Sequence, residues 1–397
     1  MTPDASTGMP LFSVLIPTKG RAYLVGYAIQ SVLNQTCADF EVVVIDNDDG
    51  GATAQVVQGF SDPRLRYIRT GGLSMPDNWE RSFREARGDY VTILTDRMVL
   101  RPWALDTLKK AFGSGDHRII SWGLDMVEDT HSGETFFTRR RAPAPLPDRV
   151  IAAPELLERF LNRSYWDTIL VLPKGLNSCC HRSVLKRLWQ GPAGRVCLAV
   201  APDYTFAFQQ LAYYDQALHL GQRLALASNR ESTGRSSQLK DNVSDEFMKQ
   251  VGGPPHSFTH VPIKAFFVQN SLMNDFLRVR ELAGGHLAAY ELPLVPYFTH
   301  CYLELAQLES QGIDYTPEIA AWRAALAAQP REVRAAVEQA VAPIARRWRI
   351  TGLRNRLFYN RLRRAVKQVK KGRVSPVFPD ILAALAWEEQ QRKGPIT

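Results

Sequence analysis

Short apolar runs alternate with stretches of helical spacing over the first hundred residues of the chain. Four runs that are rich in β-branched residues predict buried strands, and a helical pattern separates each from the next. The predicted strands are Phe12–Ile16, Glu41–Ile45, Leu65–Ile68 and Tyr90–Leu94, and the predicted helices are Leu24–Leu33, Ala52–Phe60 and Asn78–Ala86. Buried strands joined by helices form a mostly parallel sheet with helices on both faces. The sequence therefore predicts an α/β fold here.

The pattern changes after about residue 118. The expected elements are strands at Ile119–Val127 and Glu134–Arg139, helices at Pro154–Arg163 and Ser183–Trp189, and a longer helix at Pro202–Leu220. From about Ile263 onward nearly all of the sequence is helix-periodic. The Gly-Gly-Pro-Pro segment at Gly252–Pro255 is typical of a linker, so we expect two domains, residues 1–250 and 251–397.

The composition is that of a folded globular chain, with 45% hydrophobic and 22% charged residues. No run approaches the ~18 apolar residues of a membrane-spanning helix. Met1–Pro10 has neither the basic start nor the apolar stretch of a secretory signal. The five cysteines are odd in number and form no C-x-x-C pair, which favours a reduced, intracellular chain. These features predict a cytoplasmic location.

The net charge of +9 comes from one segment near the carboxyl end. Twelve Lys and Arg residues and no acidic residue lie between Arg346 and Arg373, and the rest of the chain has a net charge of −3. This distribution makes a nucleic-acid partner unlikely. Apolar residues at helical spacing within 346–373 predict a basic amphipathic helix. Two interpretations are open: the helix packs on its neighbours with solvated arginines, or it lies on an anionic membrane surface, peripheral to the inner face of the cell membrane.

Four ordered segments of the chain resemble the family-two glycosyltransferases, and the resemblance covers roughly residues 11–240. They are Ser13-Val-Leu-Ile-Pro-Thr-Lys-Gly-Arg21, Ala28-Ile-Gln-Ser-Val-Leu-Asn-Gln-Thr36, Val43-Val-Ile-Asp-Asn47 and Gly88-Asp-Tyr-Val-Thr-Ile-Leu-Thr-Asp-Arg97. The family implies a GT-A (Rossmann-like) domain, here followed by a helical carboxyl-terminal domain. It also implies an inverting enzyme that transfers one sugar from a nucleotide diphosphate-sugar, usually a UDP-sugar, to a hydroxyl group. A bacterial surface glycan, as in polysaccharide biosynthesis, or a lipid-linked precursor is the expected acceptor, and a small molecule is another.

Donor-binding residues are expected at the carboxyl ends of the predicted strands, where parallel sheets bind their ligands. The resemblance implies that Asp46 accepts a hydrogen bond from the base, that Pro17 and Thr18 offer backbone groups to the nucleoside, and that Arg21 approaches a phosphate. The alternative for Asp46 is a loop acid that caps a helix.

Asp203 is the expected catalytic base, because Pro202-Asp203-Tyr204 resembles the family segment that supplies it. Inverting transfer needs a carboxylate within about 3 Å of the acceptor hydroxyl to remove its proton. The same residues are also a good helix start, so capping is the alternative, and one loop can serve both roles.

Arg97 departs from the family pattern, which has a metal-binding aspartate at this position. Mn²⁺ and Mg²⁺ prefer carboxylate oxygens, and Arg97 offers none. Three interpretations follow. Arg97 neutralises the diphosphate in place of the metal; a metal binds through Asp96 and other ligands; or the protein is a non-catalytic sugar-nucleotide binder or scaffold.

Four further residues are candidates for an acceptor site or a lid. Asn177, Ser178 and His181 lie in the region where the family binds its acceptor, and Arg235 lies in a polar loop after the predicted catalytic segment. The alternatives are structural roles for the first three residues and a simply solvated loop for Arg235.

Overall fold

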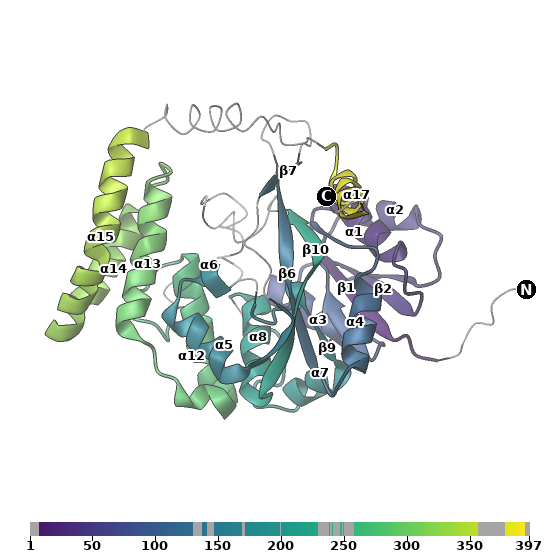
Figure 1. The fold of residues 1–397 in the computed structure, drawn as a ribbon, viewed down its shortest axis with the longest axis horizontal. Helices are drawn as coiled ribbons and strands as arrows, with labels where there is room; N and C mark the ends of the chain where they lie inside the picture. Colours follow the sequence, from purple (N-terminus) through teal and green to yellow (C-terminus); the bar gives the residue numbers. More distant parts are fainter. Residues whose placement is uncertain are drawn as a thin grey trace, which may run out of the picture.

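One mixed sheet runs through the molecule (Figure 1). The computed structural model describes residues 8–129, 137–140, 147–168, 171–198, 200–228, 238, 240, 247, 249, 258–355 and 378–393. Its main path has the strand order β3-β2-β1-β4-β9-β6-β10-β5, while β7 pairs with β6 and β8 with β10. The strands are β1 Phe12–Thr18, β2 Phe40–Asp46, β3 Leu65–Arg69, β4 Tyr90–Ile93, β5 Met98–Leu100, β6 Ile119–Asp129, β7 Phe137–Arg140, β8 Arg149–Ala152, β9 Ser178–His181 and β10 Gln216–Ser228.

Strands β1 to β4 are parallel to one another, as their apolar runs predict. Thr18 at the end of β1 pairs with Asp46 at the end of β2, and Leu15 pairs with Ile93 near the end of β4. The carboxyl ends of the three strands therefore meet at one edge of the sheet, where their polar residues gather.

Helices cover both faces of the sheet. One face packs against α1 Ala22–Leu33, α2 Ala52–Gln58 and α4 Ala104–Gly113. The other packs against α3 Met75–Glu85, α5 Ala153–Asn162, α7 Arg182–Trp189 and α8 Pro202–Tyr213. Alternate residues of β1 serve the two faces, since Val14 and Ile16 contact the first set of helices and Leu15 the second. Short helices lie at α6 Tyr165–Thr168, η1 Gly175–Asn177 and η2 Gly285–Ala289.

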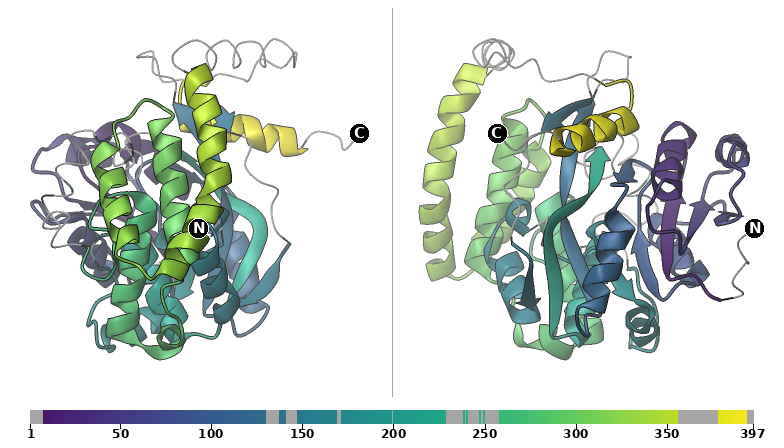
Figure 2. Two further views of the ribbon diagram at one scale, coloured as in Figure 1. Left: turned by 90° about the vertical axis from the view of Figure 1, so that its left-hand side faces the viewer. Right: turned by 45° about the vertical axis from the view of Figure 1, so that its right-hand side comes forward.

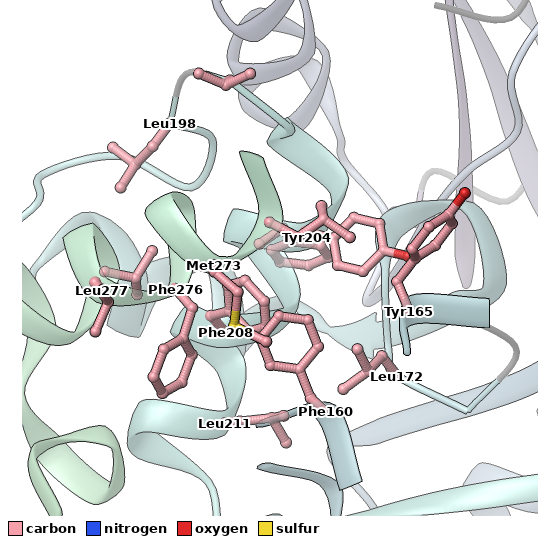
Figure 3. Close-up of a cluster of buried hydrophobic side chains, with 14 of the residues drawn as sticks. Phe160, Tyr165, Leu172, Leu198, Tyr204, Phe208, Leu211, Met273, Phe276 and Leu277 are labelled. Atoms are coloured by element: carbon pink, nitrogen blue, oxygen red, sulfur yellow. The ribbon is translucent and has the colours of Figure 1, made fainter. Parts of the chain in front are cut away.

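The described residues after 258 are mainly helical, and those up to residue 355 extend the second face (Figure 2). Its helices are α12 Val268–Ala283, α13 Leu294–Glu309, α14 Thr316–Ala327, α15 Arg331–Asn355 and α17 Ile381–Lys393. Phe276, Phe298 and Val337 belong to the same buried cluster as Leu15 of the sheet, so one continuous core joins α12 to α15 with the α/β region. Figure 3 shows the part of this cluster where α5, α8 and α12 meet.

Helix α17 returns to the sheet and buries a group of charges there. Arg101, which is 0% exposed, binds Asp125 of β6 at 2.7 Å and Glu388 and Glu389 of α17 at 2.5 Å each. Arg223 of β10 binds the other oxygen of Asp125 at 2.9 Å. Phe378, Ile381, Ala384 and Leu385 pack against apolar side chains of β5, β6 and β10. Helix α17 is therefore fixed beside β5, the strand that begins directly after Arg97.

The predicted α/β fold with a helical carboxyl-terminal region is confirmed, but one helix was placed wrongly. The helix expected at Pro202–Leu220 ends at Tyr213, and β10 begins at Gln216. β10 contains no β-branched residue and is rich in Leu and Ala, so its pattern favours a helix. Pairing with β5, β6 and β8 overrides that preference.

Several predicted features lie partly or wholly outside the described residues, among them the start of the strand expected at Glu134–Arg139. Gly252–Pro255, the expected linker, is another. The basic segment 346–373 is described only to residue 355, where it forms the end of α15. Of the helices that the structure describes, none combines the length and apolar character needed to cross a bilayer.

Candidate functional site

Asp96 joins the ends of β1 and β4 at the polar edge of the sheet. Its carboxylate is buried, with 1% of the residue exposed. Thr18 Oγ1 donates a hydrogen bond to Asp96 Oδ2 at 2.8 Å, and Arg21 Nη1 lies 3.1 Å from the same oxygen. Gly20 has a φ of +66°, a conformation that glycine adopts without strain, and it turns the chain from β1 toward α1. The structure thus brings together Thr18, Arg21 and Asp96, as the sequence predicted.

Arg97 follows directly and reaches across to another strand. Its Nη1 donates a hydrogen bond to the carbonyl oxygen of Ser228, at the end of β10, at 2.5 Å. Burial, followed by the nearby positive charge of Arg21, lowers the pKa of Arg97 to about 10, and the charges of Asp96 and Asp203 oppose this decrease. The guanidinium therefore stays positively charged at neutral pH, close to both acidic residues.

Asp203 lies in the first turn of α8 and faces the same group of charges. Its side chain is 18% exposed, so solvent can reach it. Burial raises the pKa of Asp203 above its usual value, while Lys174, the backbone N–H groups of Tyr204 and Asp203, and Arg97 lower it. The backbone contacts agree with the capping interpretation, and the partly exposed carboxylate is also suited to proton removal. Both roles are compatible with this geometry.

Lys174 is a member of the site that sequence reasoning missed. Its Nζ lies 3.9 Å from Asp203 Oδ2 and 4.8 Å from the centre of the Tyr204 ring. The side chain is only 3% exposed, and burial lowers the pKa of its ammonium group. An isolated Lys between Pro173 and Gly175 belongs to no recognisable motif, so no local signal marks it.

Asn177 and Ser178, the predicted acceptor residues, both bond the backbone of Lys174. Asn177 N–H donates to the carbonyl oxygen of Lys174 at 3.0 Å, and Ser178 Oγ donates to the same oxygen at 2.6 Å. Both residues are buried, with exposures of 0% and 1%. They fix the turn that carries Lys174, and their buried side chains leave little surface for a direct contact with an acceptor.

Asp46 lies at the same edge but is already engaged. It is 0% exposed, Tyr67 Oη donates to its Oδ2 at 2.8 Å, and the N–H of Asp48 donates to its Oδ1 at 3.1 Å. Burial and the Asp46 hydrogen bond raise the pKa of Tyr67 to about 12. Pro17 pairs with Ile45 within the sheet, next to the Thr18–Asp46 pair. Recognition of a base by Asp46 stays a prediction, and because the residue is 0% exposed it requires neighbouring groups to move.

His181 and Arg235 are not part of the group. His181 pairs with Tyr90, at the amino end of β4, whereas Asp96 follows the carboxyl end. Its Nδ1 accepts a hydrogen bond from the N–H of Ser183 and so caps α7, which is the structural alternative for this residue. Arg235 lies outside the described residues.

The donor set around Asp96 does not fit a hard divalent cation. Such ions require several oxygen ligands, and carboxylates are preferred. The Asp96 carboxylate is held by Thr18 and Arg21, and the adjacent side chain is the cation Arg97. Among the residues whose positions are described, no group of three His, Cys, Asp or Glu side chains is arranged to hold a metal.

Comparison with known proteins finds relatives of the amino-terminal part of the chain. The sequence model for "Glycosyl transferase family 2" matches residues 13–169. The chain is 33% identical over 111 residues to the GalNAc(5)-diNAcBac-PP-undecaprenol beta-1,3-glucosyltransferase of Campylobacter jejuni. This match covers 27% of this chain and 36% of that protein. It is 41% identical over 69 residues to the validoxylamine A glucosyltransferase of Streptomyces hygroscopicus subsp. jinggangensis, and this second match covers 17% of this chain and 16% of that protein. The chain therefore spans little more than a third of the length of the first of these curated relatives and less of the second.

A solved structure shares the fold. S. aureus TarS 1-349 in complex with UDP-GlcNAc aligns with a TM-score of 0.50 and 16% identity, over 92% of this chain and 93% of that one. The match supports the arrangement of a mixed sheet flanked by helices and followed by a helical region. Residues 13–169 thus match the sequence model of glycosyl transferase family 2, and the fold of the chain is the GT-A fold.

Proposed function

We propose that this protein is an inverting glycosyltransferase that moves one sugar from a UDP-sugar to a hydroxyl acceptor. The observation that carries the proposal is the charge arrangement at the carboxyl edge of the sheet. Three cations, Arg21, Arg97 and Lys174, lie with two acids, Asp96 and Asp203, at this edge. An excess of positive charge suits a diphosphate, and a partly exposed carboxylate suits the acceptor hydroxyl.

The reaction uses each residue in a distinct way. Asp203 removes the proton from the acceptor hydroxyl as its oxygen attacks the anomeric carbon from the face opposite the diphosphate. The bond between that carbon and the diphosphate oxygen breaks, and its electron pair leaves on the nucleotide. Arg97 and Lys174 neutralise this charge by electrostatic attraction and charge-assisted hydrogen bonds, which are stronger in a partly buried site than in water. This mechanism requires no divalent cation.

The relatives indicate which donor and acceptor to test first. TarS was solved with UDP-GlcNAc, which favours a uridine nucleotide as the first probe for this fold. One relative acts, by its name, on an undecaprenol-linked glycan and the other on the small molecule validoxylamine A. We propose a glycan or lipid-linked acceptor, and a small hydroxyl compound is the alternative.

Binding of UDP is expected to be independent of metal. Calorimetric titration in EDTA and in Mn²⁺ should give dissociation constants that differ by less than about tenfold. Arg97→Gln removes charge-assisted hydrogen bonds and should weaken binding by about tenfold or more. Arg118→Gln, at an arginine that is 43% exposed beside the amino end of β4, is the matched control and should bind UDP as the unaltered protein does. A metal dependence of a hundredfold or more would contradict neutralisation by Arg97.

Asp203→Asn should abolish transfer without abolishing donor binding. The amide cannot accept the hydroxyl proton, so kcat should fall by about a hundredfold to ten-thousandfold, whereas UDP affinity should stay within a few-fold. The donor is chosen beforehand by thermal shift across UDP-, GDP- and dTDP-sugars, because ligand binding stabilises the native state. If the unaltered protein binds a donor but turns over no donor–acceptor pair, it is a non-catalytic binder.

The pH profile should depend on Lys174. The base must be ionised, so kcat/KM falls as the pH decreases through the pKa of Asp203, which burial raises above its usual value. The positive charge of Lys174 lowers that pKa. Lys174→Met should therefore move the acidic limb of the profile to higher pH, and Lys174→Arg should leave it near its original position. An unchanged limb in Lys174→Met would exclude electrostatic coupling between the two side chains.

The basic segment 346–373 is proposed to bind an anionic membrane surface. The full chain should float with vesicles that contain phosphatidylglycerol at physiological salt and not with neutral vesicles, because each nearby cation contributes about 1 kcal/mol. A variant with glutamine at Arg361, Arg363, Arg364 and Lys367 should float less, while α17 stays in place. No flotation of the unaltered protein would refute this proposal.

A further inference from the structure

A buried acid on α12 holds the loop that carries Asp203. Asp275 is 0% exposed, and its carboxylate accepts hydrogen bonds from two consecutive backbone N–H groups at the start of α8. The N–H of Ala201 lies 2.7 Å from Oδ2, and the N–H of Val200 lies 3.1 Å from Oδ2 and 3.2 Å from Oδ1. These donors immediately precede the turn in which Asp203 lies.

The two helices are locked together next to this contact. Phe276, the neighbour of Asp275 in sequence, meets Phe208 of α8 edge to face, with ring centres 5.4 Å apart. Phe160 of α5 packs against both rings, at 4.7 Å from Phe208 and 5.8 Å from Phe276 (Figure 3). Close-packed aromatic side chains of this kind move little. The distance between the backbone of α12 and that of α8 is therefore fixed, and with it the place of the Asp275 carboxylate.

A packing role alone does not require an acid at this position. Burying an acid costs free energy that hydrogen bonds, counter-charges or protonation offset, and burial raises the pKa of Asp275 to about 8; an apolar side chain of similar size avoids that cost. The carboxylate provides two oxygens that can align adjacent N–H groups, and such groups at a helix start lack partners within the helix. Asp275 thus sets the direction in which the chain enters α8.

A second buried acid in the fold, away from the site, also accepts hydrogen bonds from two consecutive backbone N–H groups. Glu304 of α13 is 4% exposed and accepts hydrogen bonds from the N–H groups of Val268 and Gln269, at 3.2 and 2.7 Å, where α12 begins. The start of α12 contributes none of the charged residues of the site. Glu304 therefore serves as the comparison: it is a buried acid that also bonds two backbone N–H groups, together with the Gln238 side chain, and it holds the start of α12 rather than the loop before α8.

We propose that Asp275 is a positioning residue, and that through it the helical region after residue 258 fixes the catalytic carboxylate of Asp203. The inference rests on the proposed function of Asp203. It gives the carboxyl-terminal region a task in the reaction: the acceptor hydroxyl meets a carboxylate whose place is set by α12. A shift of about 1 Å in such a group can cost about a hundredfold in rate.

Hydrogen exchange tests the positioning without any assay of activity. Mass spectrometry should detect faster exchange in peptides that span 198–204 for Asp275→Leu, with a smaller increase for Asp275→Asn, which keeps one acceptor oxygen. Glu304→Gln should increase exchange near Val268 and leave 198–204 unchanged. Equal exchange of 198–204 in Asp275→Leu and Glu304→Gln would overturn the proposal, whether or not the protein transfers a sugar.

Kinetics test the consequence for the reaction. Asp275→Asn should lower kcat by about tenfold and Asp275→Leu by about a hundredfold, with the donor KM within about threefold, because the donor-binding cations lie on other segments. Glu304→Gln should keep kcat within about threefold at a comparable loss of stability in urea unfolding. A kcat in both Asp275 variants no lower than that of Glu304→Gln would refute the inference. If the proposed function itself is wrong, the unaltered protein will show no turnover, and this result is distinct from a failure of the positioning role.

Discussion

A carboxylate can be buried only if other groups satisfy it, and this constraint joins the distant parts of the chain. Asp96 binds Thr18 and Arg21 and so connects two strands of the sheet. Asp125 binds Arg101, which in turn binds acids on α17. Asp275 holds the start of α8 from a helix some seventy residues later in the sequence. In each case the free-energy cost of burial makes the contact specific, because an unpaired buried charge would be strongly unfavourable.

The same constraint gives the site its chemical character. With Arg97 in place of the acid of the family pattern, Arg21 and Arg97 balance the charges of Asp96 and Asp203, and Lys174 makes the local charge positive. Asp203 is then an acid among cations, partly desolvated, with opposing influences on its pKa. Burial favours the protonated form and the neighbouring cations favour the ionised form. A carboxylate whose pKa is raised above its usual value, and which neighbouring cations help to ionise, is well placed to accept a proton.

The sequence predicted what local patterns encode and missed what distant contacts create. The β-branched runs identified β1 to β4, and their ends placed Thr18, Arg21, Asp96 and Arg97 at one edge, as the structure has them. β10 was missed because its Leu- and Ala-rich segment is helical by intrinsic preference, and only pairing on both sides makes it a strand. Lys174 and Asp275 were missed because their contacts join residues that are distant in the sequence. Lys174 lies beside Asp203, and Asp275 bonds the loop before it, and no sequence spacing reveals either contact.

The return of α17 to the sheet changes the status of the basic segment that precedes it. Because α15 and α17 belong to the folded body, residues 356–377 are joined to that body at both ends. A chain fixed at both ends has fewer conformations to lose when it binds a surface. Both attachment points lie on the upper side of the molecule in Figure 1. A surface that binds this segment would therefore restrict the rotation of the whole protein relative to that surface, because the segment is joined to the body at two points.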